Sequence, residues 1–287
     1  MSKTKVSVCM IVYNQEKFVE EAINGVLLQK IDFPVEFVIA NDASTDQTHE
    51  IISKLAINTS DITFKYYNHS KNLGMTPNFI FALQACEGEF IAMCEGDDYW
   101  TDPLKLQKQV DFLENKQDFC ICFHPVDVFY EESKTIKTDT ITREVSSVST
   151  IEELTNGNFI HTPSVMLRND FEIPEWFLEC PIGDWTLYML ALNDRKIMKL
   201  DDLMAVYRKH NAGIYSGSDI KTRFRMLEST YTLVEKNISL GTQEKENLQK
   251  QISIFRSGLK SQKFTFVYLE KPLTELWKKI KRKLNGK

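Results

Sequence analysis

Residues 6–42 read VSVCMIVYNQEKFVEEAINGVLLQKIDFPVEFVIAND. Val6–Val12 is a short apolar run rich in β-branched residues, and Val35–Ala40 is a second one; each is typical of a buried strand. The apolar residues between them fall at helical spacing, and they are Val19, Ala22, Ile23, Val26 and Leu27. The segment therefore predicts a strand, a helix and a second strand, the unit from which parallel sheets are built.

The alternation of strand-like and helical patterns continues through the first third of the chain. A helical pattern at 51–56 precedes the strand-like run Ile62–Tyr67, and a helix with Pro77 in its first turn precedes the apolar run Phe90–Met93. Four strands joined by helical crossovers predict an α/β fold with a mostly parallel central sheet, covered on both faces. In such sheets, ligands bind beyond the carboxyl ends of the strands.

The patterns become purely helical towards the end of the sequence. Before that point, the clearest elements are strands at Phe119–Val128, Ser164–Arg168 and Leu203–Lys209 and a helix at Trp185–Leu192. The later helical segments lie near 219–237, 242–258 and 271–284. We therefore expect a domain at residues 1–217 and a helical C-terminal extension at residues 218–287.

The composition is that of a globular protein, because 43% of the 287 residues are hydrophobic and 26% are charged. The net charge of -5 is unevenly spread: residues 271–287 carry +6, which leaves -11 for residues 1–270. An acidic main body argues against nucleic acid as a partner.

Cysteine usage and hydropathy indicate the cellular compartment. The six cysteines form no C-x-x-C pair, and several lie inside apolar runs, as buried thiols do in a reducing compartment. The apolar run near the N-terminus is too short for a signal peptide or a membrane span, and no other stretch reaches spanning length. We therefore expect a cytoplasmic protein that contacts the inner face of the cell membrane at most peripherally.

An acidic segment follows the fourth predicted strand, where residues 94–100 read CEGDDYW. Glu95, Asp97 and Asp98 place three negative charges side by side, an arrangement that needs water, a cationic side chain or a metal ion. A solvated turn is the simpler explanation. The position at the ligand-binding end of the sheet favours Mn²⁺ or Mg²⁺ holding a phosphate, since both cations prefer oxygen ligands.

Polar residues also follow the first two strands, at Tyr13-Asn14 and at Asn41-Asp42. Folding would gather them with the acidic segment along one edge of the sheet. Asp42 is placed to accept a hydrogen bond from a base or a ribose, although a turn with capping residues explains it equally well. Neither G-x-x-x-x-G-K-[ST] nor G-x-G-x-x-G follows the first strand, which argues against P-loop NTPases and dinucleotide oxidoreductases.

Five motifs occur in the order seen in the family 2 glycosyltransferases, which the sequence resembles over about residues 5–215. They are V-S-V-C-M-I-V-Y-N (Val6–Asn14), N-D-A-S-T-D-Q-T (Asn41–Thr48), K-N-L-G (Lys71–Gly74), E-G-D-D-Y-W (Glu95–Trp100) and G-D-W (Gly183–Trp185). The resemblance implies a GT-A fold, a nucleotide-sugar donor and inversion at the transferred sugar. It is greatest to bacterial members that build lipopolysaccharide, capsule or other surface glycans.

The resemblance also implies which residues hold the nucleotide. Tyr13 would stack on the base and Asp42 would hydrogen-bond it, with Asn14 and Lys71 in the neighbouring loops. Glu95 stands where the family has the first Asp of its D-x-D signature. This difference leaves open which carboxylate meets the ribose.

The same resemblance assigns a metal site. Asp97 would be the principal ligand of Mn²⁺ or Mg²⁺ and Asp98 would assist it, so that the cation neutralises the departing diphosphate. His210 would be a third metal or phosphate ligand, since imidazole binds Mn²⁺ acceptably. The alternative for His210 is a capped end of a strand.

Asp184 matches the base of the family, which deprotonates the acceptor hydroxyl as it attacks the anomeric carbon. On sequence grounds alone, an aspartate before a helix would be an N-cap. Trp100 and Trp185 would offer aromatic faces to the acceptor sugar, unless they belong to the core.

These roles imply an inverting, metal-dependent glycosyltransferase. It would move a sugar from a nucleotide-diphosphate donor, with UDP expected, to a hydroxyl of an oligosaccharide or lipid-linked acceptor. A sugar nucleotidyltransferase is an alternative, but it predicts a glycine- and arginine-rich first loop, unlike residues 13–16. Another is a non-catalytic nucleotide- or glycan-binding subunit of a glycan assembly complex, which would neither hydrolyse nor transfer the donor.

The last residues of the sequence combine an apolar stripe with basic charge. Apolar residues recur at helical spacing, namely Leu273, Leu276, Trp277, Ile280 and Leu284, and lysines and an arginine fill much of the space between them. A basic amphipathic helix of this kind lies in a membrane interface and meets anionic lipid. The alternative is a helix packed on its own core with its lysines in water.

We expect deletion of residues 271–287 to reduce flotation of the protein with anionic liposomes, because each lysine or arginine near an anionic surface adds about 1 kcal/mol of attraction. Flotation of the full-length and shortened chains with anionic and neutral vesicles measures the effect. Equal flotation of the two chains with anionic vesicles would refute membrane binding by this segment.

Overall fold

The structure is a computed structural model that describes residues 4–57 and 61–260. Its larger sheet has eight strands, in the spatial order β3 (Ile62–Asn68), β2 (Val35–Asn41), β1 (Val6–Val12), β4 (Phe90–Met93), β10 (Met166–Arg168), β6 (Phe119–Phe123), β11 (Lys196–Lys199) and β9 (Val148–Ser149). A smaller sheet has the order β5 (Tyr99–Trp100), β12 (Ala205–Lys209), β7 (Val126–Tyr130) and β8 (Thr135–Thr140).

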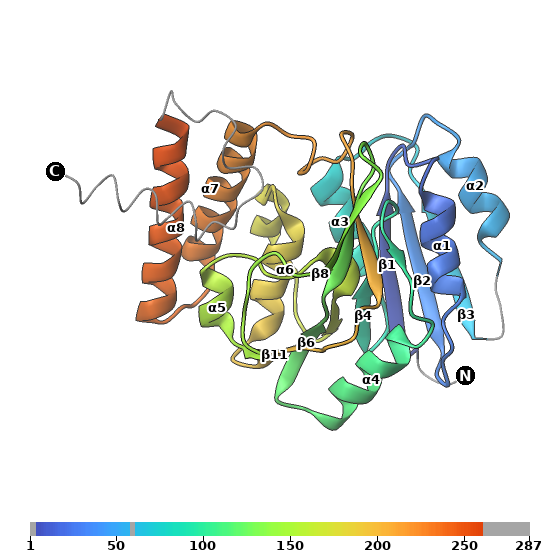
Figure 1. Ribbon diagram of the computed structural model, residues 1–287, viewed down its shortest axis with the longest axis horizontal. Coiled ribbons are helices and arrows are strands. Elements are labelled where there is room, and N and C mark those ends of the chain that lie inside the picture. The colour runs from blue at the N-terminus through green and yellow to red at the C-terminus, as the bar shows by residue number, and fades with distance from the viewer. Residues whose placement is uncertain (1–3, 58–60, 261–287) are drawn as a thin grey trace.

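The helices pack around these sheets (Figure 1). They are α1 (Val19–Leu27), α2 (Thr48–Leu55), α3 (Met75–Gln84), α4 (Lys105–Asn115), α5 (Ile151–Thr155), α6 (Gly183–Leu192), α7 (Ile220–Asn237) and α8 (Thr242–Lys260). Two short 3-10 helices, η1 (Thr162–Ser164) and η2 (Glu175–Glu179), lie in the connections around β10.

The parallel half of the larger sheet confirms the sequence prediction. β1 pairs in parallel with β2 and with β4, and β2 pairs in parallel with β3. The strand β1 therefore lies at the centre, and six of its seven residues are buried. The carboxyl ends of all four strands meet at one edge, as in other sheets built from right-handed crossovers.

The larger sheet separates two hydrophobic cores. Alternate residues of β1 point to opposite faces, so Val8 and Met10 join the core under α1, α2 and α4. Cys9 joins the other core, which also contains residues of α3, α6, α7 and α8. The prediction that both faces are covered is therefore confirmed.

One predicted strand is wrong, because Phe119–Val128 is two strands in two different sheets. β6 ends at Phe123, and the chain passes through His124 and Pro125 before β7 begins at Val126. Proline has no backbone N–H to donate to a ladder, so Pro125 cannot continue β6 within the sheet. The chain instead leaves the larger sheet and begins the smaller one.

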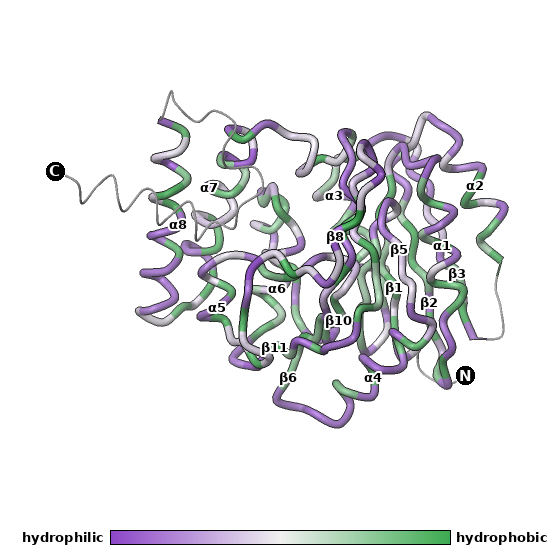
Figure 2. The backbone as a smooth tube through the Cα atoms, in the orientation of Figure 1, coloured by the Kyte–Doolittle hydropathy of each residue, from purple (hydrophilic) through white to green (hydrophobic). Residues whose placement is uncertain are grey.

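The two predicted C-terminal helices near 219–237 and 242–258 are confirmed as α7 and α8, and both pack on the same core as α6. Hydrophobic and hydrophilic segments alternate along α8, as expected for a helix with one face on a core (Figure 2). The predicted helix near 271–284, with its basic tail, lies outside the described residues. Within the described ranges, none of the helices combines the length and apolar character needed to cross a bilayer.

Gly25 sets the distance between α1 and the strand β5. A Cβ atom at this position would lie 2.9 Å from both the backbone nitrogen and the backbone oxygen of Trp100. Contacts this short cannot be relieved by a side-chain rotation, because the neighbouring atoms belong to the main chain. The absence of a side chain at residue 25 therefore allows α1 to lie against the segment that carries the acidic residues.

We expect Gly25→Ala to lower the free energy of unfolding by about 1–3 kcal/mol, because overpacking would push α1 away from β5. In an unobstructed helix the same change is stabilising by roughly 1 kcal/mol. Asn24→Ala, on the exposed side of α1, is the matched control and should not destabilise. Urea unfolding followed by circular dichroism measures both variants, and a stabilised Gly25→Ala protein would contradict the close packing.

Candidate active site

Three carboxylates cluster in the acidic turn, which we define as residues 95–98 between β4 and β5. One oxygen each from Glu95, Asp97 and Asp98 lies within 4.8 Å of the others. The turn is held against the end of β1, because the Gly96 N–H donates to the carbonyl oxygen of Ile11 at 3.3 Å. The main chain thus fixes three carboxyl groups at the carboxyl edge of the sheet.

The acidic turn is electrostatically strained. Burial is the main cause that raises the pKa of Glu95 to about 8, and the charges of Asp97 and Asp184 add to it. Burial, followed by the charges of Asp97 and Glu95, also raises the pKa of Asp98. This repulsion is relieved either by a proton on one of the carboxylates or by a bound cation.

Asp98 has one satisfied and one unsatisfied oxygen. Its side chain is buried, and Oδ1 accepts a hydrogen bond of 2.8 Å from the backbone N–H of Arg208. Oδ2 is buried and has no hydrogen-bond partner among the described residues. A buried carboxylate oxygen without a donor is costly. The three clustered carboxylates and this free oxygen fit a hard divalent cation.

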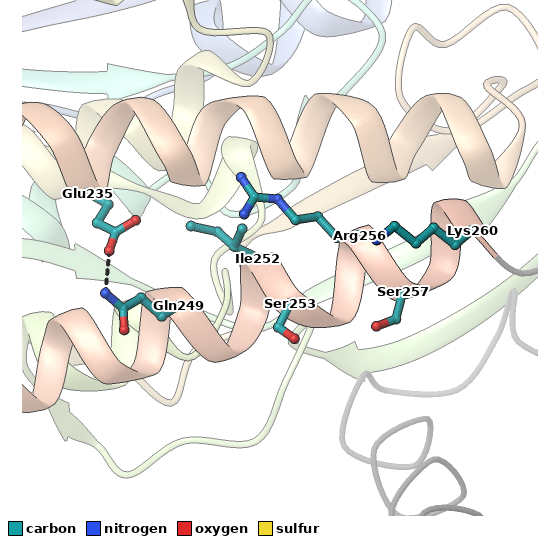
Figure 3. Close-up of a pocket in the computed structure, with 7 residues that line it drawn as sticks. All are labelled: Glu235, Gln249, Ile252, Ser253, Arg256, Ser257 and Lys260. Atoms are coloured by element: carbon teal, nitrogen blue, oxygen red, sulfur yellow. Dashed lines mark hydrogen bonds between the residues drawn. The ribbon is translucent and has the colours of Figure 1, made fainter.

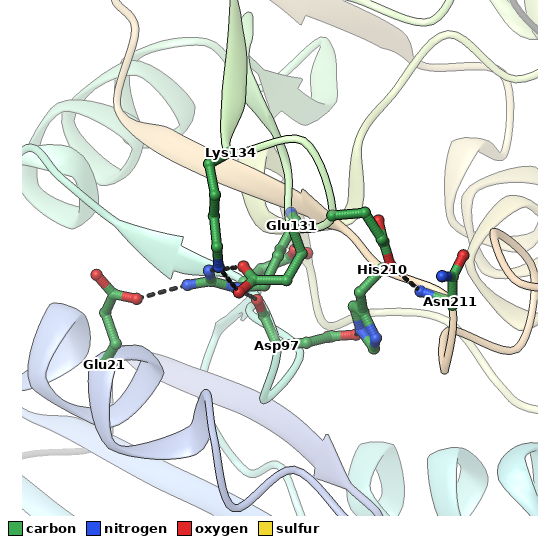
Figure 4. Close-up of polar contacts among 9 residues, drawn as sticks. Glu21, Asp97, Glu131, Lys134, His210 and Asn211 are labelled. Atoms are coloured by element: carbon green, nitrogen blue, oxygen red, sulfur yellow. Dashed lines mark hydrogen bonds and ion pairs between the residues drawn. The ribbon is translucent and has the colours of Figure 1, made fainter.

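His210 joins the acidic turn from the end of β12. Its Nε2 lies 2.9 Å from Oδ2 of Asp97, and the two side chains face each other in Figure 4. The imidazole is 9% exposed and packs on Phe18 with ring centroids 4.9 Å apart. The structure thus places His210 next to the expected metal ligand Asp97, although the two residues are 113 positions apart in the sequence.

The first loop, after β1, forms another part of the same edge. Asn14 adopts a left-handed backbone conformation with φ of 52°, and its N–H donates to Oγ of Ser44 at 2.9 Å. Its Oδ1 accepts the N–H of Thr45 at 2.8 Å, so Asn14 ties this loop to the loop after β2. The ring of Tyr13 is 45% exposed and remains open to a planar ligand.

Asp42 anchors the K-N-L-G loop. It is buried, and its two carboxylate oxygens accept the N–H groups of Leu73 at 2.6 Å and Gly74 at 3.0 Å. Asn72 Nδ2 donates to the backbone oxygen of Asp42 at 3.1 Å. The structure therefore gives Asp42 a loop-fixing role, and its contact with a base stays a prediction. Lys71 in the same loop is exposed.

Asp184 lies in the first turn of α6. The N-cap of this helix is Ile182, so the interpretation of Asp184 as an N-cap is wrong. Its Oδ2 accepts a hydrogen bond of 3.3 Å from Nδ2 of Asn158. Burial raises the pKa of Asp184, and hydrogen bonds from backbone N–H groups and from Asn158 partly oppose that rise. Because its charge also acts on Glu95, Asp184 belongs to the same electrostatic site as the acidic turn.

The two tryptophans expected to hold the acceptor are core residues instead. Trp100 is 3% exposed, donates from Nε1 to the backbone oxygen of Pro163 and packs against Nζ of Lys105. Trp185 is 1% exposed and stacks on Tyr231 with ring centroids 4.1 Å apart. Neither ring presents a face to a sugar, because both side chains are almost fully buried. The expectation of a tryptophan platform is therefore wrong for this structure.

Sequence reasoning missed two residues that contact the site. Arg208 contacts the acidic turn. Its position could have indicated this contact, because in an extended segment a residue two positions before His210 points to the same face as His210. Asn158 contacts Asp184 from a connection 26 positions away. No local pattern predicts that second contact.

A groove of about 450 Å³ lies elsewhere, between α7 and α8 (Figure 3). Its lining is mostly polar and comprises Glu235, Gln249, Ile252, Ser253, Arg256, Ser257 and Lys260. None of these residues belongs to the acidic turn or to the loops around it. The groove is therefore separate from the candidate active site.

Comparison with known sequences identifies relatives. The family model described as Glycosyl transferase family 2 matches residues 7–172. An uncharacterized protein of Mycobacterium tuberculosis (strain H37Rv) is 41% identical over 212 residues, which cover 73% of this chain and 60% of the relative. An uncharacterized glycosyltransferase of Nostoc sp. is 33% identical over 132 residues, covering 46% of this chain and 39% of the relative. The chain thus spans about 60% of the length of its mycobacterial relative.

Solved structures share the fold at low sequence identity. S. aureus TarS 1–349 in complex with UDP-GlcNAc matches with a TM-score of 0.64 and 21% identity, over 88% of this chain and 72% of that chain. Mannosyltransferase PcManGT from Pyrobaculum calidifontis, in complex with GDP-Man and Mn²⁺, matches with a TM-score of 0.64 and 16% identity. This match covers 90% of this chain and 73% of that chain. These similarities support the GT-A fold. Since the family model covers more than half of the sequence, the chain belongs to glycosyltransferase family 2.

Proposed function

We propose that this chain is a metal-dependent, inverting glycosyltransferase that moves a sugar from a nucleotide-diphosphate donor to a hydroxyl group of a glycan. The main support is the cluster of Glu95, Asp97 and Asp98, whose oxygens lie within 4.8 Å of one another at the ligand-binding edge of the sheet. Asp184 adds a fourth carboxyl group to the same electrostatic site. A metal ligand set and a base are the two parts that this reaction requires.

The metal would be held by the acidic turn. Asp97, Asp98 and His210 would ligate Mn²⁺ or Mg²⁺, and Glu95 beside them would contact the nucleotide. Support comes from the buried Oδ2 of Asp98, which has no hydrogen-bond partner among the described residues. When bound, the cation would offset the negative charge that develops on the leaving diphosphate.

Asp184 would act as the base. The acceptor oxygen attacks the anomeric carbon, the bond from that carbon to the diphosphate oxygen breaks, and the hydroxyl proton passes to the Asp184 carboxylate. A single displacement of this kind inverts the anomeric centre. The raised pKa of Asp184 makes the carboxylate a better proton acceptor, and Asn158 would orient it.

The first loop and the K-N-L-G loop would hold the nucleotide. The exposed ring of Tyr13 suits stacking on a base, and Asp42 keeps the neighbouring loop in place through Leu73 and Gly74. Uracil is our proposed base, and the TarS structure with a similar fold contains UDP-GlcNAc. Asn14 and Lys71 would line the same loops.

The acceptor is proposed to be a surface glycan, such as lipopolysaccharide or capsule, carried as an oligosaccharide or on a lipid. The sequence resemblance and the basic residues of 271–287 are the grounds for this part of the proposal. A lipid-linked acceptor would suit a peripheral membrane enzyme, since one partner of the reaction then lies in the bilayer surface.

We expect Asp184→Asn to lower sugar transfer, or donor hydrolysis without an acceptor, by about a hundredfold or more, because the base is lost. Nucleotide binding should survive, since the acidic turn and the first loop are unchanged. Calorimetric titration of UDP, GDP and dTDP, each with Mn²⁺ and with EDTA, measures binding, and release of the nucleotide from its sugar measures turnover.

Glu179→Gln, an exposed change in η2, serves as the control for Asp184→Asn and should retain activity. Near-normal transfer by Asp184→Asn would refute the base. Metal-dependent nucleotide binding without turnover in the wild type would favour the non-catalytic alternative. No binding of any nucleotide would refute the donor site.

We also expect the metal-free protein to become less stable as the pH rises from about 5 to 8, because of Glu95. The folded protein holds the Glu95 proton up to a pKa of about 8, whereas the unfolded chain releases it near the ordinary value of 4.5. The folded state therefore binds more protons in this interval, and the free energy of unfolding falls with pH. Added Mn²⁺ should restore stability at pH 8 by binding the ionised carboxylates.

Urea unfolding of the wild type and of Glu95→Gln in EDTA tests this expectation. The variant should gain stability relative to the wild type at pH 8 and gain much less at pH 5. Glu20→Gln, at an exposed carboxyl group on α1, is the control. A difference between wild type and Glu95→Gln that is independent of pH would contradict the strained acidic turn.

A further inference from the structure

We propose that Arg208 is a positioning residue that holds the acidic turn in its metal-binding shape. Its positive charge is paired with the carboxylates of Glu21 and Glu131, outside the turn. The proposal rests on the proposed metal-dependent function and adds a residue to it. Arg208 is the second-to-last residue of β12, and its side chain is 7% exposed. A buried arginine beside three carboxylates would ordinarily pair with them, and here it does not.

Arg208 contacts the acidic turn through one hydrogen bond from its side chain and one from its main chain. The guanidinium Nε donates to the main-chain oxygen of Asp97 at 2.9 Å. The main-chain N–H of Arg208 donates to Oδ1 of Asp98 at 2.8 Å. One residue thus binds the turn at two successive positions. These contacts leave Oδ2 of Asp98 and the carboxylates of Asp97 and Glu95 without a hydrogen bond from the guanidinium group.

The charge of Arg208 is paired on its other side. Nη1 lies 3.0 Å from a carboxylate oxygen of Glu131, and Nη2 contacts the carboxylate of Glu21 on α1. Lys134 in turn pairs with Glu131. Figure 4 shows Glu21, Glu131 and Lys134 gathered next to the acidic turn. These three residues and Arg208 form a neutral group, so the negative charge of the acidic turn remains for a cation.

Three aromatic rings surround the guanidinium group. Its central carbon lies 4.7 Å from the ring centroid of Phe18, 5.3 Å from that of Tyr99 and 5.5 Å from that of Phe129. Cation–π contacts of this kind, together with donors aimed at three different acceptors, suit a planar guanidinium. A lysine ammonium carries the same charge but cannot reproduce the fork and the stacking together.

The direction in which Mn²⁺ affinity changes when Arg208 is replaced distinguishes a positioning role from a purely electrostatic effect of its charge. Arg208→Gln removes a cation beside the metal site, so Coulomb repulsion alone would make Mn²⁺ bind more tightly. Arg208→Lys keeps the charge, so repulsion alone would leave Mn²⁺ binding unchanged. If Arg208 holds the turn, both variants should bind Mn²⁺ more weakly by about tenfold or more, as is usual when a residue that orients metal ligands is lost.

The experiment is a titration of the full chain with MnCl₂, in which electron paramagnetic resonance measures free Mn²⁺. Arg195→Lys is the matched control, because both Nη atoms of Arg195 also pair with carboxylate oxygens, in this case the two oxygens of Asp170. Arg195 follows the end of α6 opposite to Asp184, and its replacement should change Mn²⁺ affinity by no more than about twofold. Circular dichroism melting confirms that each variant is folded.

Weaker binding in both Arg208 variants, with an unchanged control, supports the proposal. Unchanged affinity in Arg208→Lys or tighter binding in Arg208→Gln overturns it and leaves the proposed function intact. If Arg208→Gln does not fold, Arg208→Lys alone decides. A wild-type chain that binds no Mn²⁺, even with UDP present, overturns the metal site of the proposed function and this proposal with it.

Discussion

Like charges stay together at the end of a buried strand only if the main chain around them is fixed from several directions. The acidic turn meets this constraint through three different contacts. The end of β1 holds Gly96, the smaller sheet holds Asp97 and Asp98 through Arg208, and α1 lies directly against Trp100 at Gly25. The carboxylates lie at the edge of the larger sheet, and hydrogen bonds from Arg208 in the smaller sheet hold them in that position.

The smaller sheet also explains why distant parts of the sequence meet. β12 pairs with β5, which directly follows the acidic turn, and with β7 on its other side. Arg208 and His210 stand two residues apart at the end of that strand, so both reach the acidic turn. The electrostatic character of the site therefore depends on a strand that follows the acidic turn by more than 100 residues.

The parallel half of the fold was predictable because each of its strands and helices carries its own local pattern, from Val6 to Met93. The loops that follow these strands were predictable for the same reason. The short strands β5 and β11 were missed, because β5 has only two residues and β11 has only two apolar residues between two lysines, unlike the wholly apolar four-residue strand β4. The burial of Trp100 and Trp185 and the contact of Asn158 with Asp184 depend on residues far away in sequence, so no local pattern could indicate them.

The stacking of Trp185 on Tyr231 has a consequence for the packing of α6 while the chain is being synthesised. The helix α6, which carries Asp184, packs one face on the larger sheet and places the Trp185 ring against α7. During synthesis from the N-terminus, both sheets are complete before residue 231 leaves the ribosome. A nascent chain at that stage contains the acidic turn and the strands around it but lacks the ring on which Trp185 rests. The packing of α6, and with it the support for Asp184, is therefore completed only when α7 is present, whereas every strand next to the acidic turn precedes α7 in the sequence.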